Sequence, residues 1–190
     1  MNKPAKLTLV LIIINVVLFI PELLPLSFGG YEFTYWLAAT GDSLARPWEL
    51  VTAMFGHWSI DHLLMNMISL YWLGTMIEDV HGPVKFGIIY FVSGIVGNLA
   101  VVLFAPNTLA AGASGAIFGL LGAAALLLYN LRANPGANAM FKGLIAMLAL
   151  NVINSFVPGI SMEAHFGGLV AGAACEAAVI AIDRGRRLRT

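Results

Sequence analysis

Six apolar stretches divide this chain of 190 residues, and they restrict its fold more than any other feature. Proline, glycine or charged residues bound each stretch. We expect each to form one helix across a lipid bilayer, because a helical span needs about 20 predominantly apolar residues. The first two stretches are shorter, and Lys6 and Trp58 would complete them at the interfaces. The predicted segments are 7–20, 62–77, 84–104, 114–131, 139–157 and 164–182.

The composition supports a membrane protein of all-α class. Hydrophobic residues make up 59% of the chain and charged residues 11%, against roughly 45–50% and 25% in soluble domains. This length has room for one domain, so we expect a single membrane domain over residues 1–190. The net charge of zero argues against a nucleic-acid partner. Cys175 is the only cysteine, so it forms no intrachain disulfide and is expected to fill space in the last helix.

The positions of the basic residues predict the orientation. Nine of the ten lie on one side of the six-helix arrangement, and the positive-inside rule makes that side cytoplasmic. Both chain ends are then cytoplasmic. Residues 21–25 offer no small-residue cleavage site, so we expect an uncleaved first helix rather than a secretory signal. Only Arg46 falls on the outer side. The nine inner residues are Lys3, Lys6, Lys85, Arg132, Lys142, Arg184, Arg186, Arg187 and Arg189.

One long connection, residues 21–56, faces outward and is rich in aromatic residues. Amphipathic rings favour the headgroup level of a bilayer. We therefore expect a partly folded, membrane-associated first outer loop, although simple interfacial anchoring explains the same composition. Its aromatic residues include Phe28, Tyr31, Phe33, Tyr35, Trp36 and Trp48.

Two reactive side chains open apolar segments, Ser114 and His165. Polar groups at membrane depth are functional candidates by default, and a hydroxyl with an imidazole indicates a nucleophile and its base. Ser114 lies 18 residues before Arg132 and His165 lies 19 before Arg184, so both helices would place them at one depth in the outer leaflet. Glu163 precedes His165 by only two residues and would point elsewhere, so we expect a dyad without a carboxylate.

Paired glycines predict that the two helices are neighbours. Gly115 and Gly119 are four residues apart on one, and Gly168 and Gly172 on the other, and this spacing lets helices approach closely in lipid. Phe118, one turn from Ser114, would lie beside the imidazole or serve as an ordinary core aromatic.

A third segment offers donors for an oxyanion. His62 and Asn66 are four residues apart and share one helix face, although Asn66 has an alternative role in hydrogen bonding between helices. His57 lies near the outer mouth, where it would order the loop or a water molecule. A metal site from His57, His62 and His165 is disfavoured, because no carboxylate or thiol joins them at ligand spacing. We expect neither metal nor cofactor.

The ordered set of motifs resembles the rhomboid intramembrane serine proteases over nearly the whole chain. The family has two histidines followed by an asparagine, then Gly-x-Ser-Gly, then His-x-x-Gly-x-x-x-Gly. The matching residues are His57, His62 and Asn66, then Gly112, Ser114 and Gly115, then His165, Gly168 and Gly172.

The resemblance implies the minimal six-helix bacterial core in the inner membrane, with the active site opening toward the outer face. It implies Ser114 as nucleophile, His165 as base, and an oxyanion hole from the Ser114 N–H with the His62 and Asn66 side chains. The expected substrates are transmembrane segments of other proteins, cut near the outer face through an acyl-enzyme. One departure is Trp48-Glu49, where the family commonly has Trp-Arg.

Two other functions compete with proteolysis. A catalytically silent rhomboid-like protein would bind membrane clients without cutting them, but such proteins characteristically lack the serine or the histidine. A small transporter would use the same polar residues as a pathway. It predicts repeated halves and paired broken helices, but the sequence has no duplicated halves and the reactive residues lie off-centre toward one face.

Overall fold

The computed structural model describes residues 6–23, 33–157 and 159–187, and this part of the chain is helical with no β-strand. Within these residues, four helices are long and apolar enough to cross a membrane when α1 is taken with the 3₁₀ turn after it, and α5 is shorter at 17 residues. The long elements are α1 (Lys6–Phe19), α4 (Ile60–Phe104), α5 (Ser114–Asn130), α6 (Pro135–Asn154) and α7 (Met162–Arg187).

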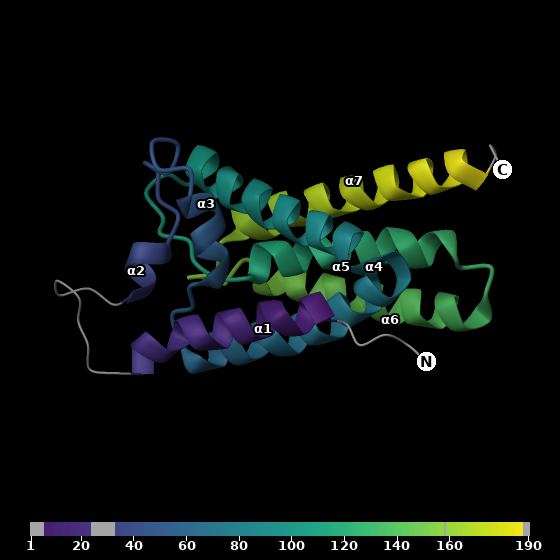
Figure 1. Cartoon of the computed structure of the whole chain (residues 1–190), viewed down its shortest axis with the longest axis horizontal. Helices are drawn as coiled ribbons and strands as arrows, with labels where there is room; N and C mark the ends of the chain where they lie inside the picture. The colour runs from purple at the N-terminus through teal and green to yellow at the C-terminus, as the bar shows by residue number, and fades with distance from the viewer. Residues whose placement is uncertain (1–5, 24–32, 158, 188–190) are drawn as a thin grey trace.

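The helix α4 is two helices joined at a sharp bend. Gly82 has φ 78° and ψ 169°, a backbone conformation that glycine adopts readily, and Pro83 follows it. The two arms correspond to the second and third apolar stretches of the sequence. They run back along the bundle from the bend, and α1 lies beside the first arm (Figure 1).

The helix α5 lies at the centre of the bundle, against both α4 and α7, while α6 packs along its outer side (Figure 1). Most α5 residues are buried, and many are glycine or alanine. Small residues allow the close backbone approach on which helix association in lipid depends. Gly122, for example, lies so near the Leu169 carbonyl that a Cβ atom would approach its oxygen to 2.4 Å.

Buried polar contacts connect the helices at the end opposite α2 and α3. The Glu78 carboxylate of α4 accepts hydrogen bonds from the Thr8 backbone N–H at 2.8 Å and the Thr8 hydroxyl at 2.7 Å, at the start of α1. His81 pairs with Glu176 of α7 at 2.9 Å, and both side chains are buried. These contacts hold α1 and α7 to the middle of the long α4 hairpin.

The long connection before α4 is folded. It contains η1 (Ile20–Leu23), α2 (Phe33–Leu37), α3 (Glu49–Thr52) and η2 (Ala53–Phe55). Trp36 and Trp48 remain 62% and 59% exposed within it. Some residues used in the sequence argument lie outside the described part, namely Lys3, Phe28, Tyr31 and Arg189 and the side chains of Arg186 and Arg187.

The Glu49 that departs from the family pattern has a defined place in this loop. Its carboxylate is largely buried, accepts a hydrogen bond from the Ser43 hydroxyl at 2.6 Å, and pairs with Arg46 at 2.7 Å. The Glu49 side chain therefore finds both of its partners within residues 43–49, and Arg46 balances its negative charge.

Candidate active site

Ser114 is the first residue of α5, and a glycine turn presents it to a cavity. Gly112 has φ 145°, and its N–H donates to the Ala53 carbonyl at 2.8 Å, which fixes the segment against the outer loop. A Cβ atom at Gly112 would lie 2.8 Å from the His62 ring, so a larger residue would require that ring to move. The turn therefore brings the N-terminus of α5 next to His62.

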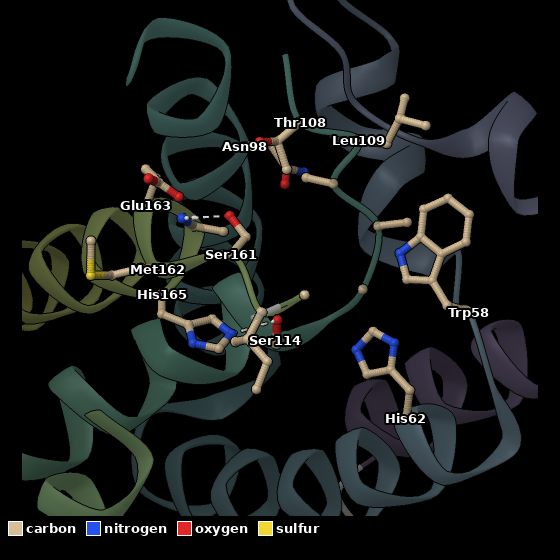
Figure 2. A pocket seen from close by; sticks show the side chains of 16 residues that line it. Trp58, His62, Asn98, Thr108, Leu109, Ser114, Ser161, Met162, Glu163 and His165 are labelled. Carbon is tan, nitrogen blue, oxygen red and sulfur yellow. Dashed lines mark hydrogen bonds between the residues drawn. The ribbon is translucent and has the colours of Figure 1, made fainter. Parts of the chain in front are cut away.

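His165 lies in the first turn of α7 and meets Ser114 directly. Its Nε2 atom is 3.0 Å from the Ser114 Oγ, within hydrogen-bond range, as Figure 2 shows. His165 is 7% exposed and Ser114 is half-buried. A hydroxyl and an imidazole in this geometry can act as nucleophile and general base.

Two glycine contacts allow the helices to come this close. A Cβ atom at Gly168 would lie 1.9 Å from the Gly115 carbonyl oxygen, and one at Gly172 would lie 2.0 Å from the Gly119 oxygen. Real Cβ contacts essentially never fall below 3.0 Å. The spacing of four residues on α5 thus faces the same spacing on α7, and the backbones are in contact.

Two side chains position the His165 ring, one against its face and one at its Nδ1 edge. Phe118 stacks on it with ring centroids 4.0 Å apart and an interplanar angle of 12°. The Ser155 hydroxyl lies 2.7 Å from Nδ1. Sequence reasoning missed Ser155. Its position at the end of the fifth apolar stretch, at the level expected for the dyad, was the available signal.

His62 is fixed in the first turn of α4 because the Ser59 hydroxyl caps the helix and accepts from the His62 N–H at 3.1 Å. Figure 2 shows its ring facing Ser114 from the side opposite His165. Asn66 lies one turn further along α4 and is buried, and its side-chain nitrogen has no hydrogen-bond partner among the described residues. The structure thus brings His62 to the cavity, whereas Asn66 does not line it.

The cavity in front of the pair has a volume of about 740 Å³, large enough for several side chains of a peptide. The loop before α5 forms one wall and the start of α7 the other. Its polar lining residues are His62, Asn98, Thr108, Ser114, Ser161, Glu163 and His165. Within the described residues, no cluster of three or more histidine, cysteine or acidic side chains could hold a metal ion.

His57 lies in the loop behind His62 and is 1% exposed. Its ring contacts that of His62 edge-on, with centroids 5.0 Å apart, and its backbone carbonyl accepts from the Thr34 hydroxyl at 3.0 Å. Burial, with the charge of His62 as a smaller cause, lowers the pKa of His57 to about 3, and a backbone hydrogen bond with Phe55 opposes this in part. His57 is therefore neutral near pH 7 and joins the loop to His62.

Most of this chain is similar in sequence to known proteins. Residues 44–182 match the model of the Rhomboid domain. "RHOMBOID-like protein 6, mitochondrial" of Arabidopsis thaliana is 35% identical over 128 residues, 67% of this chain and 42% of that protein. "Rhomboid protease GluP" of Bacillus subtilis is 37% identical over 153 residues, 76% of this chain and 29% of that protein.

A further relative carries a different description. "Inactive RHOMBOID-like protein 8" of Arabidopsis thaliana is 32% identical over 124 residues, 65% of this chain and 35% of that protein. The chain spans less than half the length of each of these relatives. These relatives thus include one described as a rhomboid protease and one described as inactive. Because the Rhomboid domain model matches most of its residues, this chain belongs to the rhomboid family of integral membrane proteins.

Proposed function

We propose that this chain is an intramembrane serine endopeptidase that uses Ser114 and His165 as a catalytic dyad. The observation that carries the proposal is the 3.0 Å contact between Ser114 Oγ and His165 Nε2 at the wall of the cavity. A base must lie within about 2.6–3.2 Å of the proton that it removes, and this pair does so.

The chemistry follows the sequence of acyl transfer. His165 Nε2 takes the Ser114 proton as the oxygen attacks the scissile carbonyl, and the imidazolium then protonates the leaving amine. The acyl-enzyme is hydrolysed when His165 removes a proton from water and returns it to Ser114. In this scheme the His165 imidazole makes each proton transfer in turn, and no carboxylate takes part.

The proposed oxyanion hole combines the Ser114 N–H with the side chains of His62 and Asn66. Support comes from the position of Ser114 at the start of α5, where backbone N–H groups lack partners within the helix and the helix dipole favours negative charge. The ring of His62 faces Ser114 (Figure 2). Asn66, whose amide nitrogen has no hydrogen-bond partner in the described part of the chain, would donate after a small movement toward the cavity.

The proposed setting is a single domain of six membrane-crossing helices, counting the two arms of α4 separately. Both chain ends would be cytoplasmic, the active site would open toward the outer face of a bacterial inner membrane, and the first outer loop would associate with the membrane. The distribution of basic residues supports this orientation. The start of α1 and the end of α7 also both lie toward the end of the bundle opposite α2 and α3 (Figure 1).

The proposed substrates are transmembrane segments of other proteins, cut near the outer face of the bilayer. A helical peptide bond is hydrogen-bonded and shielded, so a target segment must unwind before Ser114 reaches its carbonyl. Glycine or proline in the target would lower that cost, because each disfavours helix by about 1 to 3 kcal/mol relative to alanine.

The alternative is a silent rhomboid-like protein that binds such segments without cutting them. One relative described as inactive gives this alternative a basis. The contact between Ser114 and His165 favours the protease, because a binding protein needs no hydrogen bond between a nucleophile and a base.

The test uses purified protein in lipid vesicles with a panel of single-pass transmembrane reporters. We expect cleavage at one bond per susceptible reporter, located by mass spectrometry, and none with Ser114→Ala or His165→Ala. Reporters that bind but stay intact with the unmodified chain would support the silent alternative. Cleavage that persists in Ser114→Ala would overturn the dyad.

A further inference from the structure

Ser155 makes two hydrogen-bonding contacts that together restrict where the His165 proton lies. Ser155 follows the last residue of α6 and is 2% exposed. Its hydroxyl donates to the Asn151 carbonyl, 2.9 Å away, and lies 2.7 Å from His165 Nδ1. A serine hydroxyl has one proton to donate and two lone pairs to accept with.

The Asn151 carbonyl can only accept, so the single Ser155 proton is used there. Toward His165, the Ser155 oxygen can then only accept, and Nδ1 must carry a proton. A neutral imidazole has one N–H, which leaves Nε2 with a free lone pair. That lone pair faces the Ser114 hydroxyl at 3.0 Å, as a general base requires.

We propose that Ser155 is a positioning residue that selects the Nδ1–H tautomer of His165. This inference rests on the proposed function and assigns Ser155 the role that a carboxylate has in a serine-protease triad. Phe118 fixes the plane of the ring through its 4.0 Å stack, and Ser155 fixes the rotation within that plane. A neutral hydroxyl suits this depth, because burying an ionised carboxylate costs far more than burying a hydrogen-bonded hydroxyl.

The opposite arrangement makes a different prediction. If Ser155 donated to Nδ1, the neutral ring would carry its proton on Nε2, pointing at Ser114, and His165 could not act as a base. The Asn151 carbonyl would keep only the Ser155 backbone N–H, at 3.0 Å. The two arrangements differ in which ring nitrogen carries the proton, and this is measurable without turnover.

The first measurement is the nitrogen NMR spectrum of the full chain with ¹⁵N-labelled histidine, at a pH where His165 is neutral. The His165 signals are identified as those that disappear from the spectrum of His165→Ala. We expect a protonated Nδ1 and an unprotonated Nε2. A proton on Nε2 in the unmodified chain would overturn the proposal, whatever the activity of any variant.

The second measurement compares Ser155→Ala, Ser155→Thr and the control Thr75→Val. The control removes a hydroxyl that also donates to the carbonyl four residues earlier, that of Tyr71 at 2.6 Å, but it is half-buried on α4 and does not line the cavity. We expect Ser155→Ala to lower kcat about 10- to 100-fold with little change in KM, because the buried N–H loses its partner. Ser155→Thr keeps the hydroxyl and should retain most of the activity, and Thr75→Val should match the unmodified chain.

Failure of this inference and failure of the proposed function are distinguishable. If Ser155→Ala and Thr75→Val were equally active while Ser114→Ala was inactive, Ser155 would have no positioning role and the dyad would stand. If Ser114→Ala were active, the dyad itself would fail. Should Ser155→Ala not fold, the tautomer measured in the unmodified chain decides.

Discussion

Replacing Gly168 with alanine tests whether backbone contact between α5 and α7 is required for the dyad. The added Cβ atom would lie 1.9 Å from the Gly115 oxygen and 2.8 Å from its carbonyl carbon, both backbone atoms that cannot rotate away. The helices must separate by about an ångström to reach the 3.0 Å below which real contacts do not fall. Ser114 and His165 lie within one turn of this contact.

The same separation would stretch the 3.0 Å hydrogen bond between Ser114 and His165 to about 4 Å, beyond the range of a hydrogen bond. Loss of general-base assistance costs about 10²–10⁴-fold in rate. Overpacking should cost about 1–3 kcal/mol of stability, offset in part by the roughly 0.5–1 kcal/mol that alanine gains over glycine in a helix. The cleavage rate should therefore fall by orders of magnitude, while the free energy of unfolding changes only modestly.

The assay is cleavage of a transmembrane reporter in vesicles, with thermal unfolding measured on the same preparations. Gly185→Ala is the matched control, since it lies on the same helix and its Cβ would meet nothing within 4 Å. We expect full activity and equal or higher stability for the control. A Gly168→Ala protein with normal activity would refute the close-approach argument.

Two further predictions concern His62, Asn66 and His57. His62→Ala and Asn66→Ala should each lower kcat by ~10–10³-fold with KM little changed, as for single oxyanion donors, and an effect on KM alone would make either residue a substrate contact. The pKa of His57 falls from 6.5 to about 3 on burial, so the unfolded chain binds more protons than the folded one between these values. Stability should be complete above pH 6.5 and decrease as the pH falls toward 3, by up to about 1.4 kcal/mol per pH unit. His57→Gln should flatten this dependence in pH-resolved unfolding, and an unchanged slope would contradict the assignment.

The positions of the helices could be predicted because hydropathy in a membrane protein marks them directly. The stretch predicted at 114–131 is α5, Ser114–Asn130, and the stretch at 164–182 lies within α7, Met162–Arg187. The second and third stretches are joined as one element because Gly82 turns the chain within a single residue. Hydropathy showed a break there but not its geometry.

Part of the site could be predicted because its glycines recur at a spacing of four residues on each of two helices. The glycine pairs of α5 and α7 predicted a close approach, and the structure has Gly168 in contact with the Gly115 backbone. Ser155 could not be predicted in this way. It meets His165 because α6 ends beside the start of α7. Its sequence signal was its depth near the end of the fifth apolar stretch, with no partner at a helical spacing to strengthen it. The contacts of Glu49 could not be predicted either, because its partners are loop residues that follow no helical spacing.

The central claim, that Ser114 is a nucleophile activated by His165, is tested most directly by covalent labelling. The purified chain is treated with a fluorophosphonate and the modified peptide is identified by mass spectrometry. We expect a single adduct on Ser114, none in Ser114→Ala, and much slower labelling in His165→Ala, because the probe requires an activated serine. An adduct on another serine, or equal labelling of Ser114→Ala, would contradict the account.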